Sequence, residues 1–502
     1  MSEKIRIKHS GLIVFSSKIF SVLTGLIFTV VVTRNLSVND FGIWQYLSLI
    51  LSYAVFPATL IPYWATRFYA RGAHVAKTTI LSNMILSTPS FLIFLILAPL
   101  TSTVINVNLS LFHLISFQIF LVYLSTSLEA LALAKQPHLI GYETISFEVT
   151  KIVLALLLFL TLNLKLENLI IIVILAYLAQ CLTLIFFLRK DFMDEKERFD
   201  WVTQKKWFFN IWLPLFNSFP GFIGGLDLFV LAVLTKSTFS LAFYKVAYSI
   251  ATVISYSLST TIALYPNLLK GGGRKDIEET LNFFLIFAVP ITFGAVFLAK
   301  PILHIFKHEY EEASILLIFM APQFLLKSLI HIFGDVIIGM EKVDMQENAS
   351  FKAFLKSKLF KWPLLNYIRN IIAVALTFIF LMSTTLRLNN LIINDFSLYA
   401  AFNCLLANII ADFFLFIKSY LISIKTIKFV FPLNKLFKYC FASIVMVIML
   451  KILNPNKSIE TLFTVCIGAI VYFICLFLID FESRILFKRI FTYIKSKGKL
   501  WE

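Results

Sequence analysis

Long apolar runs, separated by short polar segments, make up most of this sequence. Each run has about the 20 residues that an α-helix needs to cross the hydrocarbon core of a bilayer. The pattern therefore predicts an all-α integral membrane protein with about fourteen transmembrane helices. They are predicted at 11–33, 43–62, 79–100, 110–134, 139–163, 167–188, 207–235, 238–268, 278–299, 313–340, 363–383, 396–417, 436–453 and 460–479.

The composition favours a membrane protein over a soluble one. Of the 502 residues, 59% are hydrophobic and 15% are charged, whereas a soluble domain has about 25% charged residues. A net charge of +17 suggests nucleic-acid binding in a soluble protein. Here no connecting segment is long enough to form a nucleic-acid-binding domain, and excess Lys and Arg mark cytoplasmic loops instead.

The distribution of Lys and Arg predicts the topology. With the N-terminus placed inside, 32 of the 45 Lys and Arg residues lie in inner segments, 8 in outer segments and 5 within the helices. This asymmetry predicts a multi-pass protein of the cell membrane with both termini in the cytoplasm. Three glycosylation sequons then fall in outer loops, at Asn35, Asn108 and Asn456.

Three stretches of the sequence carry a family resemblance. They are TRNLSVNDFGIWQYLSLI (33–50), LDLFVLAVLTKSTFSLAFYKVAYSIATVI (226–254) and HIFKHEYEEASILLIFMAP (304–322). Each resembles an outer turn or loop of the polysaccharide biosynthesis, O-antigen flippase-like family within the multidrug/oligosaccharidyl-lipid/polysaccharide (MOP) exporter superfamily. The resemblance implies that the protein flips a lipid-linked oligosaccharide or polysaccharide precursor by alternating access. The implied partner is a glycan carried on polyprenyl phosphate or diphosphate.

The first two stretches also resemble each other, which indicates an internal repeat. A shift of 202 residues matches Thr33-Arg34 with Thr235-Lys236, Phe41 with Phe243, and Tyr46 with Tyr248. Transporters are commonly built from two such repeats. We therefore expect two pseudo-symmetric six-helix lobes around a central cavity, followed by two more helices. The N-terminal lobe is predicted at 1–206, the C-terminal lobe at 207–420, and helices 13 and 14 with a basic cytoplasmic tail at 421–502.

Eleven Lys, Arg, Asp and Glu residues lie in the interior of the predicted helices, away from their ends. Each costs on the order of 3 kcal/mol at the centre of a membrane helix unless it is paired or hydrated. These side chains are therefore expected to face partners or a water-filled cavity. Equal depth or short spacing predicts three ion pairs: Asp227 with Lys245, Asp335 with Arg369, and Glu148 with Lys151.

Four basic residues are candidates for binding an anionic substrate. Lys18 and Lys327 have no acidic neighbour within one or two helical turns. Arg34 falls at the predicted outer end of the first helix, and Arg369 lies within the eleventh. Phosphate oxygens pair well with Lys and Arg, so these four residues suit a phosphate-bearing headgroup.

Acidic residues within the helices are candidates for coupling transport to an ion. Glu129, Asp227 and Asp412 have the chemistry to carry H⁺ or Na⁺, and equally the chemistry to serve as partners in ion pairs. Asp335 and Lys245 are candidates for ion coupling or for an ion pair as well, because each has a predicted ion-pair partner. The sequence leaves the driving ion open.

A motif rich in Pro and Gly occupies the seventh predicted helix. The stretch FPGFIGGLD places Pro220, Gly221, Gly224 and Gly225 just before Asp227. Proline removes a backbone donor and glycine weakens a helix, so the motif predicts a kink, a broken helix or a hinge.

Two alternative functions remain open. A glycan polymerase or ligase needs catalytic groups on the outer face, where His304, His308 and Glu311 or Glu312 have a spacing that fits a metal. A charged loop over a helix end is the simpler interpretation of those residues. A drug or ion exporter of the same superfamily is the second alternative. We expect a transporter and not an enzyme, without cofactor, metal or nucleic acid, in contact with membrane lipids.

Overall fold

Helices are the only regular elements in the part of the chain that the structure describes. The computed structural model describes residues 7–161, 165–192, 198–262, 264–269, 271–341, 355–387, 393–453, 455, 457–480 and 483–484. The all-α prediction is therefore confirmed for these residues. The sequon at Asn456 and most of the predicted basic tail lie outside the described residues.

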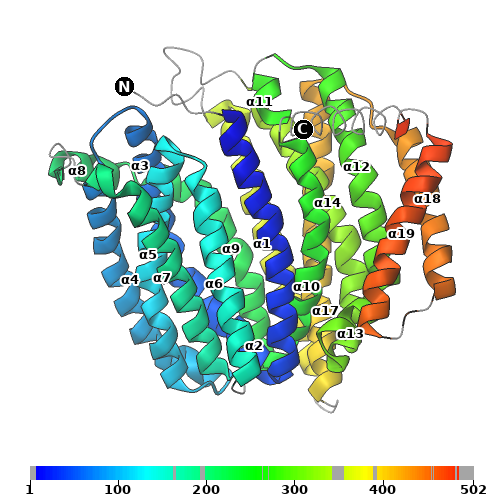
Figure 1. Ribbon diagram of the computed structural model, residues 1–502, viewed down its shortest axis with the longest axis horizontal. Coiled ribbons are helices and arrows are strands. Elements are labelled where there is room, and N and C mark those ends of the chain that lie inside the picture. The colour runs from blue at the N-terminus through cyan, green and yellow to red at the C-terminus, as the bar shows by residue number, and fades with distance from the viewer. Residues whose placement is uncertain are drawn as a thin grey trace, which may run out of the picture. The chain divides into compact units, whose positions relative to one another are not determined.

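Figure 1 shows the helices along the chain. The first half contains α1 (Ile7–Asn35), α2 (Val38–Ala54), η1 (Phe56–Thr59), α3 (Leu60–Ala70), α4 (Ala76–Val104), α5 (Leu109–Lys135), α6 (Leu139–Thr161), α7 (Leu166–Phe192), α8 (Trp201–Phe209) and α9 (Trp212–Thr235). The second half contains α10 (Thr238–Ser255), η2 (Tyr256–Thr261), α11 (Leu264–Leu269), α12 (Arg274–Phe297), α13 (Ala299–Phe306), η3 (His308–Ala313), α14 (Ser314–Gly339), α16 (Lys358–Arg387), α17 (Ile393–Thr426), α18 (Leu433–Leu453) and α19 (Ser458–Ile479). Each predicted transmembrane segment falls on one or more of them.

Among the described residues, 12 helical segments are long and apolar enough to cross a membrane. A further span is broken, because Val38–Ala54 and Phe56–Ala70 meet at an angle of 50°. The break falls at Pro57 in η1, where proline lacks the N–H that a continuous helix needs. α6 is not among the 12, and it carries Glu143, Glu148 and Lys151 along its 23 residues. The predicted polytopic fold is confirmed.

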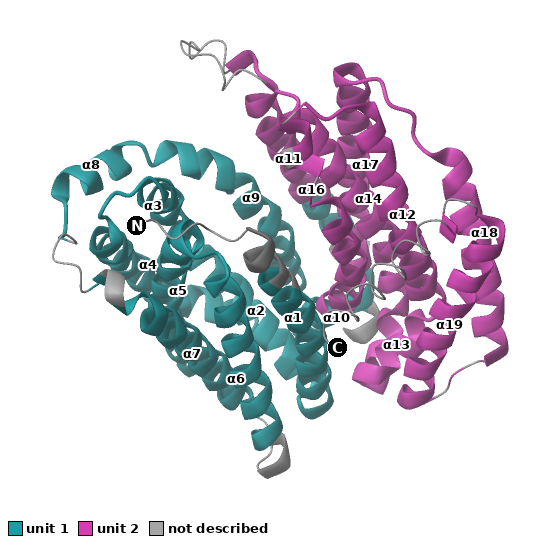
Figure 2. Ribbon diagram, turned by 45° about the horizontal axis from the view of Figure 1, so that its top comes forward, with its two compact units in different colours: residues 1–242, 377–400 teal, residues 243–376, 401–502 magenta. Residues whose placement is uncertain are grey.

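The chain divides into two compact units (Figure 2). Unit 1 comprises Met1–Ala242 and Thr377–Ala400, and unit 2 comprises Phe243–Leu376 and Ala401–Glu502. The division passes through α10, α16 and α17, whereas the predicted lobe boundaries fall within α8 and near the end of α17. The lobe boundaries after 206 and 420 stay a prediction.

Unit 1 is organised around α5, which packs against α2, α3, α4 and α7. α1 lies along α6, and α6 lies along α7. The break between α2 and α3 is supported from this core, because Asn83 donates from Nδ2 to the carbonyls of Ala58 at 3.1 Å and Tyr123 at 2.9 Å. Thr126 also donates to the Ala58 carbonyl, at 3.2 Å. Side chains thus satisfy a backbone group that the broken helix releases.

A tight turn connects α1 to α2. Ser37 is the N-cap of α2 and accepts a hydrogen bond from the backbone N–H of Asp40 at 3.0 Å. Next to it, Asn39 Oδ1 accepts a hydrogen bond from the Thr238 hydroxyl at 2.5 Å. A Cβ on Gly42 would overlap the carbonyl oxygen of Thr238. The Phe-Gly step therefore lets α2 approach the first turn of α10 within unit 1.

Unit 2 has α14 in its interior, and 56% of this span is buried. α12 packs against α14 and α18, and α18 packs against α19. Two buried tyrosines join these helices: Tyr472 donates to the carbonyl of Ile286 at 2.9 Å, and Tyr439 donates to Asn282 Oδ1 at 2.5 Å. A well-packed interior helix is a fixed support for polar side chains.

The Pro- and Gly-rich motif lies inside α9, which is continuous from Trp212 to Thr235. The broken-helix alternative is therefore wrong. Membrane helices tolerate proline, because neighbouring groups satisfy the backbone that proline releases. Gly225 packs closely, since a Cβ there would lie 3.1 Å from the Tyr53 hydroxyl. A hinge role for Pro220, Gly221 and Gly224 stays a prediction.

Candidate functional site

Three helices of unit 2 bring polar side chains together in one buried cluster, which we call the Asp412 network. Both oxygens of Asp412 are occupied, because Arg369 Nε donates to Oδ1 at 2.7 Å and Gln323 donates to Oδ2 at 2.7 Å. The residue is 2% exposed. The full network contains Gln323 and Lys327 of α14, Arg369 and Asn370 of α16, and Asn408 and Asp412 of α17.

The guanidinium of Arg369 is paired on several sides. Nη1 donates to Asn370 Oδ1 and Nη2 donates to Asn408 Oδ1, each at 2.8 Å. Nη2 also lies 2.7 Å from Asp412 Oδ1. A charge removed from water is stable only when its hydrogen-bonding groups are satisfied. The two asparagines supply the acceptors that Asp412 alone does not.

Lys327 brings a second cation to the same carboxylate. Its Nζ lies 3.7 Å from Asp412 Oδ2 and 5.2 Å from the ring centre of Phe324, and its side chain is 32% exposed. One carboxylate neutralises one of the two cations, so the network carries an excess positive charge. Because Arg369 already holds the carboxylate at shorter range, Lys327 is the cation that a further anion can engage.

Polar residues follow one face of α14. Gln323, Lys327, His331 and Asp335 are spaced by four residues, which places them on successive turns. His331 Nδ1 lies 3.5 Å from Asp335 Oδ2, and the His331 side chain is 62% exposed. Exposed polar groups at membrane depth face water and not hydrocarbon. We therefore infer that this face of α14 borders a hydrated space.

Unit 1 holds a pair of carboxyl groups on neighbouring helices. Gln180 of α7 donates from Nε2 to Glu129 of α5 at 2.9 Å and to Glu143 of α6 at 3.1 Å. Glu143 is 3% exposed. Within the described part of the chain, neither carboxyl group forms an ion pair with a basic side chain. Two negative charges at one amide repel each other strongly in a low dielectric, so the pair suits one shared proton or one bound cation.

The predicted ion pair on α6 is confirmed. Lys151 Nζ lies 2.8 Å from Glu148 Oε2. Ser21 and Thr24 of α1 donate to the two oxygens of Glu148 at 2.9 and 2.8 Å. These contacts fasten α1 to α6, which is a structural role.

A second predicted ion pair is not formed. The pair between Asp335 and Arg369 is wrong, because Arg369 is bound to Asp412 and Asp335 lies beside His331. The physical reason is that α17 offers the carboxylate of Asp412 at 2.7 Å from the Arg369 guanidinium. Lys327 has no acidic neighbour within two turns of its own helix, and Asp412 supplies one from a different helix.

The remaining predicted residues lie on three helices. Lys18 and Arg34 are exposed on α1, and their role in substrate binding stays a prediction. Asp227 is 6% exposed on α9 and accepts a hydrogen bond from the N–H of Leu228 at 2.6 Å. Lys245 of α10 lies 5.4 Å from the ring centre of Tyr248. Asp227 belongs to unit 1 and Lys245 to unit 2, and their pairing stays a prediction.

Sequence reasoning missed several members of the two clusters. Gln323, Asn370, Asn408 and Gln180 are uncharged, so a search for ionisable residues passes over them. A signal for them existed, because Asn408 precedes Asp412 by four residues and Gln323 precedes Lys327 by four. Polar residues at this spacing share a face of a helix.

Comparisons with known proteins show which of them share this arrangement of helices. Neither the comparison with protein-family models nor the search of curated protein sequences finds a match. Solved structures do match, beginning with the lipid II flippase MurJ in an inward closed conformation. It is 14% identical, the match covers 93% of this chain and 98% of that one, and the TM-score is 0.66.

Two multidrug transporters share the fold as well. An inward-facing multidrug resistance MATE family transporter of the MOP superfamily is 13% identical, with 80% of this chain and 95% of that one covered, at a TM-score of 0.56. A MATE structure in the straight conformation is 14% identical, with 84% and 96% covered, at a TM-score of 0.52. The first is described as a flippase and the second as a transporter. The likeness confirms the predicted fold, and the O-antigen flippase-like family stays a prediction from the motifs.

Proposed function

We propose that this protein flips a glycan carried on polyprenyl phosphate or diphosphate across the cell membrane by alternating access. The observation that carries the proposal is the excess positive charge of the Asp412 network. A lysine that shares a carboxylate with a better-placed arginine, and that is one-third exposed, is suited to meet a second anion. Phosphate supplies that anion, since its oxygens form strong, charge-assisted hydrogen bonds with Lys.

The fold supports a lipid-linked cargo. The likeness to the lipid II flippase extends over nearly the whole of both chains. Together with the resemblance of the outer turns to polysaccharide flippases, this favours a substrate with a lipid tail and an anionic headgroup. Lys18 and Arg34 of α1 are the further cations that we assign to headgroup binding, in a protein with both termini cytoplasmic. Arg369 contributes indirectly, because it holds Asp412.

A drug exporter is the second candidate, because the MATE transporters have the same fold. The charge of the Asp412 network argues against a cationic drug, which Lys327 and Arg369 would repel at close range. A glycan polymerase or ligase is disfavoured because the structures that share the fold are transporters.

The carboxyl pair of Glu129 and Glu143 is the coupling site in this proposal. Gln180 holds both groups at hydrogen-bonding distance, so uptake or release of one proton or cation changes the charge of the pair by one unit. Asp412 is less suited to this task, because Arg369 engages it at 2.7 Å.

The test is complementation in cells that lack the gene, with the position of the lipid-linked glycan as the readout. Lys327→Met removes the charge and keeps the length, Lys327→Arg keeps the charge, and Lys418→Met removes an exposed lysine of α17. We expect Lys327→Met to reduce rescue about 10-fold or more, because a hydrogen bond to a charged group contributes about 1.5–3 kcal/mol. The other two variants should rescue.

Accumulation of a complete glycolipid on the inner face is the result that the proposal requires in cells without the protein. An unfinished glycan on the outer face would instead indicate an enzyme. Equal rescue by Lys327→Met and Lys418→Met, at equal membrane levels, would remove the Asp412 network from the mechanism.

A further inference from the structure

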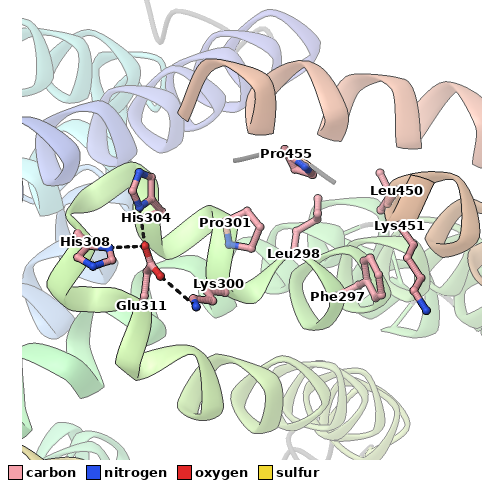
Figure 3. Close-up of a pocket in the computed structure, with 10 residues that line it drawn as sticks. All are labelled: Phe297, Leu298, Lys300, Pro301, His304, His308, Glu311, Leu450, Lys451 and Pro455. Carbon is pink, nitrogen blue, oxygen red and sulfur yellow. Dashed lines mark hydrogen bonds and ion pairs between the residues drawn. The ribbon is translucent and has the colours of Figure 1, made fainter. Parts of the chain in front are cut away.

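Two histidines and one glutamate converge at the loop between α13 and α14. His304 lies in the last turn of α13, and His308 and Glu311 belong to η3. Glu311 Oε1 lies 2.6 Å from His304 Nδ1 and 2.6 Å from His308 Nδ1. Figure 3 shows both rings directed at the same oxygen. One nitrogen from each ring and one carboxylate oxygen all lie within 4.8 Å of one another.

The local chain geometry explains the convergence. α13 ends at Phe306, and Lys307 is extended, with φ −170° and ψ 154°. This residue turns the chain so that η3 folds back along α13, with Tyr310 fully buried as its anchor. His304 and Glu311, seven residues apart, are thereby brought face to face.

The ligand atoms fit a tetrahedral metal ion. Two imidazole nitrogens and one carboxylate oxygen form a known set for zinc, with metal–ligand distances of about 2.0–2.2 Å. Such bonds place ligand atoms about 3.4 Å apart in a tetrahedron. The two hydrogen-bonded distances of 2.6 Å therefore need to open by less than about 1 Å to admit an ion.

Lys300 leaves the metal-binding oxygen accessible. Its Nζ lies 3.4 Å from Oε2 of Glu311, the oxygen that neither histidine contacts. The carboxylate would therefore bind an ion through Oε1 alone.

A pocket beside the cluster provides room for the fourth ligand. It has a volume of about 420 Å³ and extends from the cluster past Pro301 to Leu450 and Lys451 of α18 (Figure 3). His308 is the most open member, with 81% of its side chain exposed. Water or a small anion can therefore reach a metal held here.

The geometry points to a binding site for one divalent transition-metal ion, with Zn²⁺ as the ion that this ligand set fits best. His304, His308 and Glu311 provide three ligands, and the pocket side provides an open fourth position, as in zinc sites that exchange a water molecule. A bound ion joins α13 to η3 and fixes the entry into α14. This site is separate from the Asp412 network and does not depend on the proposed transport function.

The test measures metal bound to the purified full-length protein. The affinity tag is removed, the protein is stripped with a chelator, and Zn²⁺ is titrated and counted by elemental analysis, with Co²⁺ absorption as a report of tetrahedral geometry. The variants are His308→Asn and Glu311→Gln. Glu312→Gln is the matched control, because Glu312 is exposed next to the site and has no place in the cluster.

We expect one Zn²⁺ per chain in the wild type and in Glu312→Gln. The affinity should fall by more than about 10-fold in His308→Asn and Glu311→Gln, since even the loss of an outer-shell partner costs that much. His308 is exposed, so its variant should fold as the wild type does. Absence of stoichiometric Zn²⁺ in the wild type, or equal binding by His308→Asn and Glu312→Gln, would overturn the proposal.

Discussion

Each charged side chain within the membrane must be paired or hydrated. At Asp412 the pairing is unequal: Arg369 holds the carboxylate at 2.7 Å, and Lys327 approaches it at 3.7 Å. Loss of either partner of a buried ion pair typically costs about 3–5 kcal/mol. Arg369 therefore stabilises the network. Lys327 contributes less to its stability and is the freer of the two cations to contact a further anion.

The carboxyl pair gives a prediction on ion coupling. Glutamine has the charge of a protonated glutamate, so Glu129→Gln and Glu143→Gln combined should fix the pair in its uncharged state. We expect this double variant to lose the dependence of transport on a proton or sodium gradient. The measurement is transport in vesicles with and without each gradient. Glu167→Gln, on the exposed first turn of α7, is the control that should keep the dependence. Unchanged gradient dependence in the double variant would exclude this pair as the coupling site.

Sequence reasoning succeeded at this scale only for local partners. Glu148 and Lys151 are three residues apart, and their ion pair was predictable from helical spacing. Arg369 and Asp412 are separated by 43 residues on different helices, so the choice between Asp335 and Asp412 depended on helix packing. Gln180 was missed for a related reason, because it contacts two acids that lie 51 and 37 residues before it in the sequence.

At the scale of helices and turns, the connection between α1 and α2 is the clearest example of how the sequence specifies packing. Ser37 caps α2, and Asn39 and Gly42 bring that helix against Thr238 at the start of α10. Both turns come from stretches that the internal repeat relates. The two stretches that resemble each other, 33–50 and 226–254, thus contact each other at their turns within unit 1.

Gly42→Ala should destabilise the protein. The added methyl group would overlap the Thr238 carbonyl oxygen, which belongs to the backbone and has little freedom to move. Overpacking of this kind costs about 1–3 kcal/mol. The measurement is the thermal unfolding midpoint in detergent. Gly25→Ala on α1 is the matched control, because nothing lies within 4 Å of a Cβ there. An unfolding midpoint for Gly42→Ala as high as that of Gly25→Ala would contradict the close packing.

The positions of the helices were predictable, whereas their irregularities were only partly so. Backbone groups in hydrocarbon must be satisfied within the segment, so a long apolar run has few alternatives to a helix. The span predicted at 43–62 is broken at Pro57, whereas Pro220 lies within a continuous helix. Asn83 and Thr126 satisfy the backbone carbonyl that is opened near Pro57, and sequence alone does not reveal such partners.

At the scale of the whole molecule, the fold and the charges lead to one account. A fold shared with a lipid II flippase and with MATE transporters contains an excess cation in unit 2 and an acid pair in unit 1. The first suits an anionic headgroup and the second suits an exchangeable ion. The fold class was predictable because the bilayer restricts the choices, whereas the sites required the positions of individual side chains.

The most direct measurement is flipping of a labelled lipid by the purified protein in vesicles. The probe is a fluorescent polyprenyl diphosphate disaccharide, and a membrane-impermeant quencher reports which leaflet holds it. The account predicts that the wild type and Lys327→Arg move the probe to the protected leaflet, and that Lys327→Met does so about 10-fold more slowly. A wild-type protein that leaves this probe in place while it exports a cationic dye would contradict the account and identify a drug exporter.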